Sequence, residues 1–302
     1  MKKFLLPMLL PVLTISAIAQ GDFQAPAVLS TKEGRTINAY ILATTKTDIR
    51  YKTSSVSTDF TDAKLRDFQT VFVLPPSEYQ EAMDLYEAGK FEVAEAKFKA
   101  LVETFKPIAN LDNNYSTLSA YYAMECMRKR GDFEALSAAL NDFQKGPITR
   151  DHQLRQLDLY VMWDAVRTES WDRLLKLAEQ RDDEKLPGYQ RAQVAYCKAL
   201  ALEKAERSDD AILEYNIAMT ADSAGSTQIA QKSAIAVLQI YLAMPEVQVA
   251  MKEWGTEAEN KKSAGSGTLQ EAVSLAELYE SFIKKDTPLP ENLKKFLDYK
   301  AS

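Results

Sequence analysis

One local pattern, repeated along the chain, constrains the fold more than any other feature. In the stretch YEAGKFEVAEAKF, Gly89 separates two segments whose apolar residues fall at helical spacing. Glycine inside a helix costs about 1 kcal/mol relative to alanine, so we expect a turn at this position. The same frame recurs around Gly131, Glu169 and Glu206, at intervals of 42, 38 and 37 residues. The chain after Ser77 is therefore predicted to form antiparallel helix pairs with turns at these four residues.

This spacing resembles the tetratricopeptide repeat, a helix pair of about 34 residues. In that family a small residue lets the two helices approach, a glycine or polar residue makes the turn, and an aromatic residue anchors the second helix. Ala82 and Ala94 match the small positions, and Phe91 and Phe98 match the aromatic ones. The resemblance implies an α-solenoid of helix pairs over residues 77–260. The longer intervals imply longer loops between pairs, and glutamate replaces glycine at the last two turns.

The resemblance also implies a concave groove lined by the first helix of each pair. Aromatic and methionine side chains offer a large contact area at a small loss of conformational entropy, which suits recognition of peptides and proteins. The expected groove positions are Tyr79, Met83, Tyr86, Tyr121, Glu125, Arg128, Leu159, Trp163, Tyr196 and Leu200. The alternative is that several of these tyrosines belong to the core. One subfamily clamps a C-terminal carboxylate with Lys and Asn on this face, but Tyr, Met and Glu occupy those positions here.

The first 19 residues have the pattern of a secretory signal peptide. Lys2 and Lys3 precede the apolar run FLLPMLLPVLTI, and the small-x-small sequence at 17–19 follows, so cleavage is expected before Gln20. An uncleaved membrane anchor is the alternative. It is disfavoured because the run is shorter than the roughly 20 residues of a spanning helix and contains two prolines. The mature protein is therefore expected to be exported, periplasmic or secreted, without a transmembrane span.

Residues 20–74 are expected to form a small all-β module. Apolar and polar residues alternate from Ile37 to Ile41, which is the periodicity of a strand with one buried face. Turn-forming segments divide the region into about five short strands. The stretch EGRTINAYILATTKTDIRY is similar to SH3-like modules of bacterial envelope proteins. Pro75 and Pro76 then end the strand region, since proline cannot donate to a sheet ladder.

Beyond residue 218 the repeated pattern fades. A strongly apolar helix is expected over TQIAQKSAIAVLQIYLAM, with Pro245 as its end. The run NKKSAGSGT is predicted to be a flexible break, because Gly and Ser without apolar anchors do not pack. Residues 261–302 are predicted to form helices that cap the last repeat, since a solenoid needs an atypical end to cover its exposed face.

The acidic composition argues against nucleic acid as a partner. Removal of residues 1–19 leaves 35 basic and 43 acidic residues, a net charge of −8. A phosphate-binding surface needs clustered Lys and Arg. The basic runs MRKR at 127–130 and NKKS at 260–263 are short and lie among acids, so we interpret them as solvated helix ends.

Few residues of this sequence suit catalysis or metal binding. Cys126 and Cys197 are the only cysteines and His152 is the only histidine, which excludes a disulfide framework and a four-cysteine zinc site. The cysteines would lie on first helices two repeats apart, too far for a disulfide, so two free thiols are predicted. Asp151 and His152 diverge by about 100° on a helix and cannot act together. We expect no cofactor, no metal and no enzymatic activity.

These features favour an exported, non-enzymatic protein-binding scaffold or adaptor, whose groove holds a peptide or protein partner in the cell envelope. The alternative is a structural subunit of an envelope or outer-membrane assembly complex, in which the helices contribute to a permanent interface. An enzyme is the least favoured class.

Overall fold

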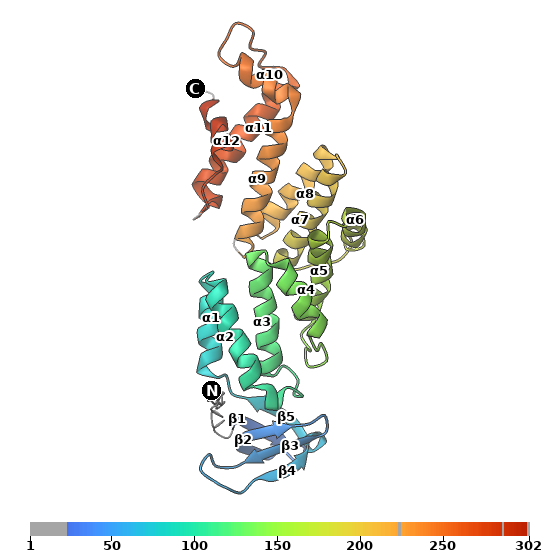
Figure 1. Cartoon of the computed structure of the whole chain (residues 1–302), viewed down its shortest axis with the longest axis vertical. Coiled ribbons are helices and arrows are strands. Elements are labelled where there is room, and N and C mark those ends of the chain that lie inside the picture. The colour runs from blue at the N-terminus through green and yellow to red at the C-terminus, as the bar shows by residue number, and fades with distance from the viewer. Residues whose placement is uncertain (1–22, 223–224, 286, 301–302) are drawn as a thin grey trace, which may run out of the picture.

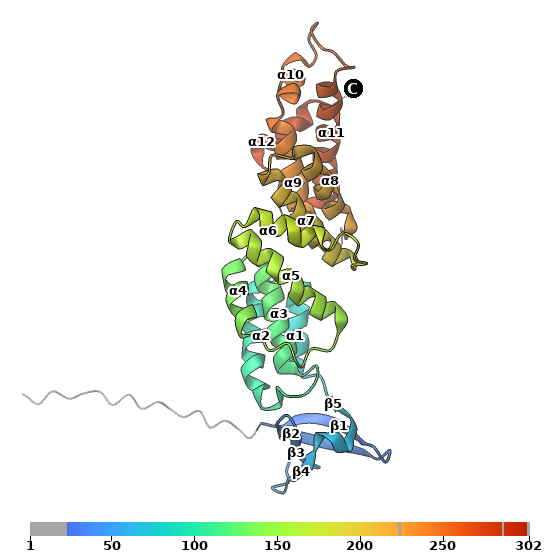
Figure 2. The same ribbon diagram turned by 90° about the vertical axis from the view of Figure 1, so that its right-hand side faces the viewer.

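The fold places a small β-sheet at one end of an elongated helical body (Figure 1), and the perpendicular view agrees (Figure 2). The computed structural model describes residues 23–222, 225–285 and 287–300, so the predicted signal peptide lies outside the described residues. Within these ranges the chain forms twelve α-helices and a five-stranded antiparallel sheet. The predicted class, mainly helical with a small β part on the N-terminal side, is confirmed.

Five strands form the sheet, as the alternation of apolar and polar residues predicts. The order across the sheet is β4-β3-β2-β1-β5, so β1 pairs with both β2 and β5. Ala27 and Leu29 of β1 are buried, and Ala27 lies opposite Ala39 of β2 and Val73 of β5. A short 3₁₀ turn, Leu65–Asp67, joins β4 to β5. The strands are β1 (Ala25–Thr31), β2 (Thr36–Thr44), β3 (Asp48–Lys52), β4 (Thr61–Lys64) and β5 (Phe68–Val73).

One face of the sheet shares a core with the first helices. Leu29 and Ile41 of the sheet belong to the same apolar cluster as Phe98, which lies on the second helix. Asn110 Nδ2 also donates a hydrogen bond to the carbonyl oxygen of Thr44 at 3.1 Å. The sheet is therefore packed onto the helical body and is not attached by the proline linker alone.

Four helix pairs follow the sheet, and each turns where the sequence predicts. Gly89, Gly131, Glu169 and Glu206 have φ values of 74°, 79°, 51° and 58°, all in the left-handed region. At each turn this residue's N–H donates to the carbonyl three residues earlier, and the next N–H donates to the carbonyl five residues earlier. This Schellman motif satisfies the last carbonyls of the first helix. The pairs are α1 (Ser77–Glu87) with α2 (Phe91–Thr104), α3 (Tyr115–Arg130) with α4 (Phe133–Asp142), α5 (Asp151–Arg167) with α6 (Trp171–Glu179), and α7 (Gly188–Lys204) with α8 (Ser208–Ala221).

Four further helices complete the chain at the end opposite the sheet (Figure 1). They are α9 (Thr227–Ala243), α10 (Pro245–Glu253), α11 (Ala264–Leu278) and α12 (Glu291–Lys294). Pro245 follows the end of the apolar helix, as predicted, and is itself the first residue of α10. No single helix among the described residues is long and apolar enough to span a membrane. Within the described ranges, α9 and α10 taken together reach that length and composition, but they are bent by 76° relative to each other.

The prediction of a flexible break at NKKSAGSGT is wrong, because its second half begins α11. Ser263 is the N-cap of that helix, and its Oγ accepts a hydrogen bond from the N–H of Ser266 at 3.1 Å. Gly265 is buried, and a Cβ at this position would collide with the backbone of Glu246 in α10. The glycine therefore permits a close approach of two helices and does not belong to a linker.

Candidate functional site

Five of the ten predicted groove residues are buried, so the expectation that they are exposed is wrong for these five. Trp163, for example, stacks between Phe133 and Tyr196, with ring centroids 4.9 and 6.0 Å away. The physical reason is that side chains of neighbouring helices pack against these five residues and cover them. The buried residues are Tyr121, Glu125, Arg128, Leu159 and Trp163, and the half-buried ones are Tyr79, Met83, Tyr86, Tyr196 and Leu200.

An aromatic cluster occupies the space between the first two helix pairs. Tyr79 makes edge contacts with Phe98 and Tyr115, at centroid distances of 5.9 and 4.9 Å. Tyr86 makes a similar contact with Tyr122 at 5.5 Å. Aromatic pairs of this kind contribute about 0.5–1.5 kcal/mol each beyond the area they bury. Tyr79 and Tyr86 therefore help to form the core, which is the alternative that the sequence left open.

A buried ion pair lies at the centre of the predicted groove. Arg128 Nε and Nη2 donate to Glu125 Oε1 and Oε2, both at 2.8 Å, and Tyr160 Oη donates to Glu125 Oε1 at 2.6 Å. The Arg128 and Glu125 side chains are only 7% and 6% exposed. Burial alone raises the pKa of Glu125, but the charge and hydrogen bonds of Arg128 lower that pKa below its usual value. The interpretation of MRKR as a solvated helix end is therefore wrong for Arg128.

Three polar side chains of α5 and α7 also bond to one another. Gln156 and Gln193 exchange two hydrogen bonds of 2.9 Å, and Trp163 Nε1 donates to Gln193 Oε1 at 2.9 Å. All three side chains are buried. Because these polar atoms are paired within the chain, this part of the inner surface stabilises the fold and is not available to a partner.

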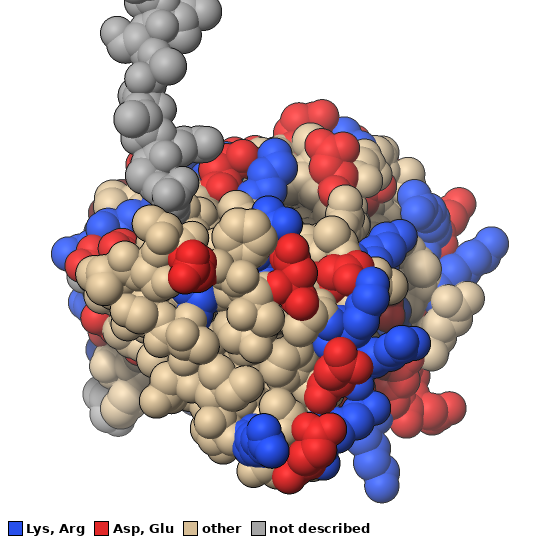
Figure 3. Space-filling model, turned by 90° about the horizontal axis from the view of Figure 1, so that it is seen from below, with Lys and Arg blue, Asp and Glu red and all other residues tan. Residues whose placement is uncertain are grey.

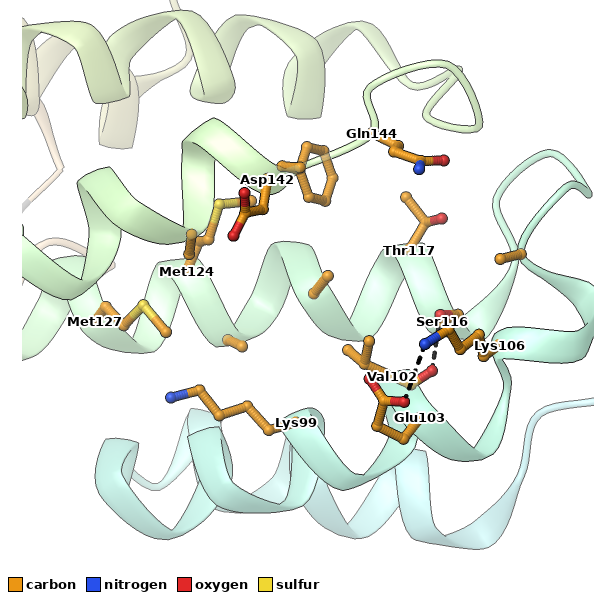
Figure 4. A pocket seen from close by; sticks show the side chains of 15 residues that line it. Lys99, Val102, Glu103, Lys106, Ser116, Thr117, Met124, Met127, Asp142 and Gln144 are labelled. Atoms are coloured by element: carbon orange, nitrogen blue, oxygen red, sulfur yellow. Dashed lines mark hydrogen bonds and ion pairs between the residues drawn. The ribbon is translucent and has the colours of Figure 1, made fainter.

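One open site is a cavity of about 660 Å³ between α2, α3 and α4, which we call the α2–α4 cavity (Figure 4). Lys99 and Glu103 of α2 lie on one side of it, and Asp142 of α4 lies on the other (Figure 4). Ser116 Oγ of α3 donates to the carbonyl oxygen of Val102 at 2.9 Å. The cavity is lined by Lys99, Val102, Glu103, Lys106, Ala109, Ser116, Thr117, Ala120, Ala123, Met124, Met127, Ala139, Asp142, Phe143 and Gln144.

Small side chains on α3 create this space. Ser116, Ala120 and Ala123 recur at helical spacing on the face that lies between α2 and α4. Met124 and Met127 lie toward one end (Figure 4), where flexible thioethers can adapt to an irregular surface. No predicted groove residue lines this cavity. The signal that could have revealed it is the row of small residues in STLSAYYAMECM.

A second cavity, of about 570 Å³, lies between the α1–α2 turn, the end of α3 and the start of α9, and we call it the inner cavity. Two predicted residues, Tyr86 and Arg128, line it. Lys129 Nζ lies 5.4 and 5.5 Å from the ring centroids of Tyr86 and Phe91. Burial lowers the pKa of Lys129, and the charge of Arg128 lowers it further. Arg128, Lys129 and Lys285 are the basic residues of its lining, and Glu87 is an acidic one.

Groups suited to catalysis are scattered over the described residues. His152 is exposed in the first turn of α5. Cys126 and Cys197 are buried and unpaired, as the sequence predicts, and burial raises the pKa of Cys126 to about 12. A thiol with such a pKa stays protonated and is a poor nucleophile. Within the ranges that the structure covers, no three His, Cys, Asp or Glu side chains are placed to hold a metal ion.

Comparison with known proteins assigns no family to the chain. No protein-family model matches it, and no curated protein is significantly similar to it. The functional conclusion therefore depends on the cavities and on the arrangement of the helices.

Proposed function

We propose that this chain is an exported, non-enzymatic scaffold that binds a protein or peptide partner in the cell envelope. The α2–α4 cavity is the observation that carries this proposal, because it is open, largely apolar and has a few polar groups at its edge. Helices α2 and α4 lie on either side of it, and small residues of α3 lie between them. A helical or extended segment of a partner can therefore approach the α3 backbone closely.

The proposal includes a tetratricopeptide-like array of helix pairs. Its support is the same Schellman turn at the end of α1, α3, α5 and α7. The packing order supports it too, because α2 lies against α3, α4 against α5, and α6 against α7. Each second helix thus contacts the first helix of the following pair. Arrays of this kind bind their partners along extended surfaces.

We also propose that the sheet is an SH3-like module and that the protein is exported. The support for the module is the return of β5 to pair with β1 and the 3₁₀ turn that precedes β5. The support for export is the basic and apolar pattern that ends before Gln20.

A pair of alanine-to-tryptophan variants tests the binding site. Ala120 lines the α2–α4 cavity, so Ala120→Trp fills it, whereas Ala100 is exposed on α2 outside the cavity. The mature chain is used to recover crosslinked partners from native envelopes. We expect the wild type and Ala100→Trp to recover the same partner and Ala120→Trp to lose it. Equal recovery by all three proteins, with unchanged circular dichroism, would contradict the assignment of this cavity.

The outer face of the sheet favours a second candidate function, a structural subunit of an envelope assembly. Phe72 in the edge strand β5 and Leu74 just after it are 57% and 42% exposed. Seen from the sheet end, charged side chains gather along one side, and uncharged ones cover much of the remaining face (Figure 3). Exposed apolar surface can mark a permanent interface. Light scattering at several concentrations separates the two functions, since a constant monomer mass supports the adaptor and a stable oligomer supports the subunit.

A further inference from the structure

The edge strand β5 presents backbone groups that have no partner in the sheet. It lies at the end of the strand order and pairs on one side only, with β1. The N–H of Leu74 donates to the carbonyl oxygen of Pro26 at 2.8 Å. Alternate residues of an antiparallel ladder face the same neighbour, so the N–H and C=O groups of Val71 and Val73 point away from β1. Among the described residues, no hydrogen bond reaches these outward groups.

The open part of this edge is short and has two clear limits. The pairing with β1 slips between Ser30 and Thr31, which places a bulge near the start of β5. Pro75 follows the strand and has no N–H to donate. The regular edge therefore runs over residues 70–74, a length of about 17 Å at the rise of an extended strand.

The two edges of the sheet differ in charge. On β4, the opposite edge, Asp62 pairs with Arg50 at 2.8 Å and Lys64 pairs with Asp48 at 2.5 Å. Charged side chains on an edge strand disfavour pairing with another chain. Strand β5, with the sequence FQTVFV, carries no charged residue. Its regular part therefore lacks the protection that β4 has.

Apolar side chains lie beside the open edge on the outer face of the sheet. Phe72 is opposite Val28 of β1, and its side chain is 57% exposed. Leu74, two residues further, is 42% exposed, whereas Val73 points to the other face and belongs to the core. A strand added at this edge would place a side chain next to Phe72, where aromatic and β-branched residues form stabilising cross-strand pairs.

We infer that the β5 edge binds an extended peptide segment of a partner as a sixth strand of the sheet, at a site separate from the α2–α4 cavity. The segment donates hydrogen bonds to the carbonyl oxygens of Val71 and Val73 and accepts hydrogen bonds from their N–H groups. An aromatic or β-branched side chain of the segment packs against Phe72.

The size of the edge favours a peptide over a second copy of this chain. Outward N–H and C=O groups on alternate residues of a strand are matched by the backbone of another extended segment. A stable dimer usually needs about 20–30 residues on each side of its interface. Two copies that meet through residues 70–74 fall well short of this number. Transient recognition of a peptide tolerates a smaller interface.

Selection of random displayed peptides on the mature chain tests the inference. We expect the selected peptides to share a segment without proline that has aromatic or β-branched residues at alternate positions. Val71→Pro removes an outward N–H and keeps the ladder to β1, since an edge strand tolerates proline where its N–H faces solvent. This variant should bind the selected peptides about tenfold more weakly or worse.

Asp62→Pro on β4 is the matched control. The N–H of Leu65 donates to the carbonyl oxygen of Thr47 at 2.9 Å, so the alternation along β4 points the N–H of Asp62 away from β3. This variant changes the same kind of position at the opposite edge. It should select the same peptides as the wild type and bind them equally well.

N-methylated peptides test the hydrogen bonds without any change to the protein. Methyl groups on every second amide nitrogen of a selected peptide remove either the N–H groups that face β5 or those that face away from it. We expect one set of methyl groups to abolish binding and the other set to leave it unchanged. Equal effects of the two sets, unchanged binding by Val71→Pro, or a selection that enriches no peptide would overturn the inference.

Two further results separate this site from the other surfaces. A dimer in light scattering that Val71→Pro dissociates would overturn the choice of a peptide over a second copy. Ala120→Trp should select the same peptides as the wild type, and loss of these peptides would place them in the α2–α4 cavity instead. Val71→Pro should still recover the partner crosslinked at that cavity, so failure of the cavity and failure of the β5 edge are distinguishable.

Discussion

At the scale of single residues, Glu169 and Glu206 hold the left-handed conformation that glycine adopts in the two earlier turns. A residue other than glycine loses roughly 1–2 kcal/mol in this conformation. We expect Glu206→Gly to raise the free energy of unfolding by about 0.5–1 kcal/mol, because the strain relieved exceeds the entropy added to the unfolded chain. Urea unfolding measures this change.

Gly89→Ala is the matched reverse substitution. Open space surrounds the Cα of Gly89, so an added methyl group meets no neighbour and only the conformational preference changes. The free energy of unfolding should fall by about 1 kcal/mol. A decrease with Glu206→Gly, or no change with Gly89→Ala, would contradict the role assigned to these turns.

The buried pair of Glu125 and Arg128 gives a prediction about pH. Glu125→Gln leaves the Arg128 charge without its partner and should lower the free energy of unfolding by about 3–5 kcal/mol at neutral pH. The pKa of Glu125 is lowered in the folded state, so its contribution is present above the ordinary carboxyl pKa and is lost as pH falls through the folded pKa. Glu125→Gln should therefore flatten the acid limb of the stability curve.

Glu103→Gln is the control for this pair. The Glu103 side chain is 71% exposed in its pair with Lys106, and exposed ion pairs contribute about 0–1 kcal/mol. Urea unfolding at neutral and acidic pH compares the two variants. An equal effect of Glu103→Gln and Glu125→Gln would show that burial of the Glu125 pair has no special consequence.

At the scale of secondary-structure elements, two glycines in the first turns of α11 give opposite predictions. Gly265→Ala places a methyl group against the backbone of Glu246 and should lower the free energy of unfolding by about 1–3 kcal/mol. Gly267→Ala adds a methyl group in open space and should raise it by up to about 1 kcal/mol, because alanine favours helix. Thermal unfolding of both variants checks this. Similar effects would mean that α10 and α11 are not closely packed.

The elements that local chemistry decides could be predicted from the sequence. The turns at Gly89 and Glu206 follow from apolar residues at helical spacing, a pattern that is interrupted at similar intervals along the chain. The strands follow from the alternation of apolar and polar residues. The start of α11 could not be predicted in this way. Its composition is that of a linker, and the need for Gly265 exists only because Glu246, far from it in the sequence, comes close to it in the fold.

At the scale of the whole molecule, the sequence could identify candidate surface residues but not which surfaces stay open. Tyr121 and Ala120 are neighbours on α3. Tyr121 was predicted to line the binding groove because its side chain is large and aromatic, whereas Ala120 was not. The packing of neighbouring helices buries Tyr121, whereas Ala120 lines the α2–α4 cavity. This outcome depends on the relative positions of α2 and α4, which no local pattern contains.

Photo-crosslinking in native envelopes tests the central claim, that a partner occupies the α2–α4 cavity, most directly. A photoreactive amino acid is placed at Gln144, which lines the cavity, and at the matched position Gln239, which is exposed on α9 outside the described cavities. We predict that the Gln144 probe crosslinks one envelope protein, that the Gln239 probe does not, and that Ala120→Trp abolishes the crosslink. The same products from both probes, or no product from Gln144, would contradict the account.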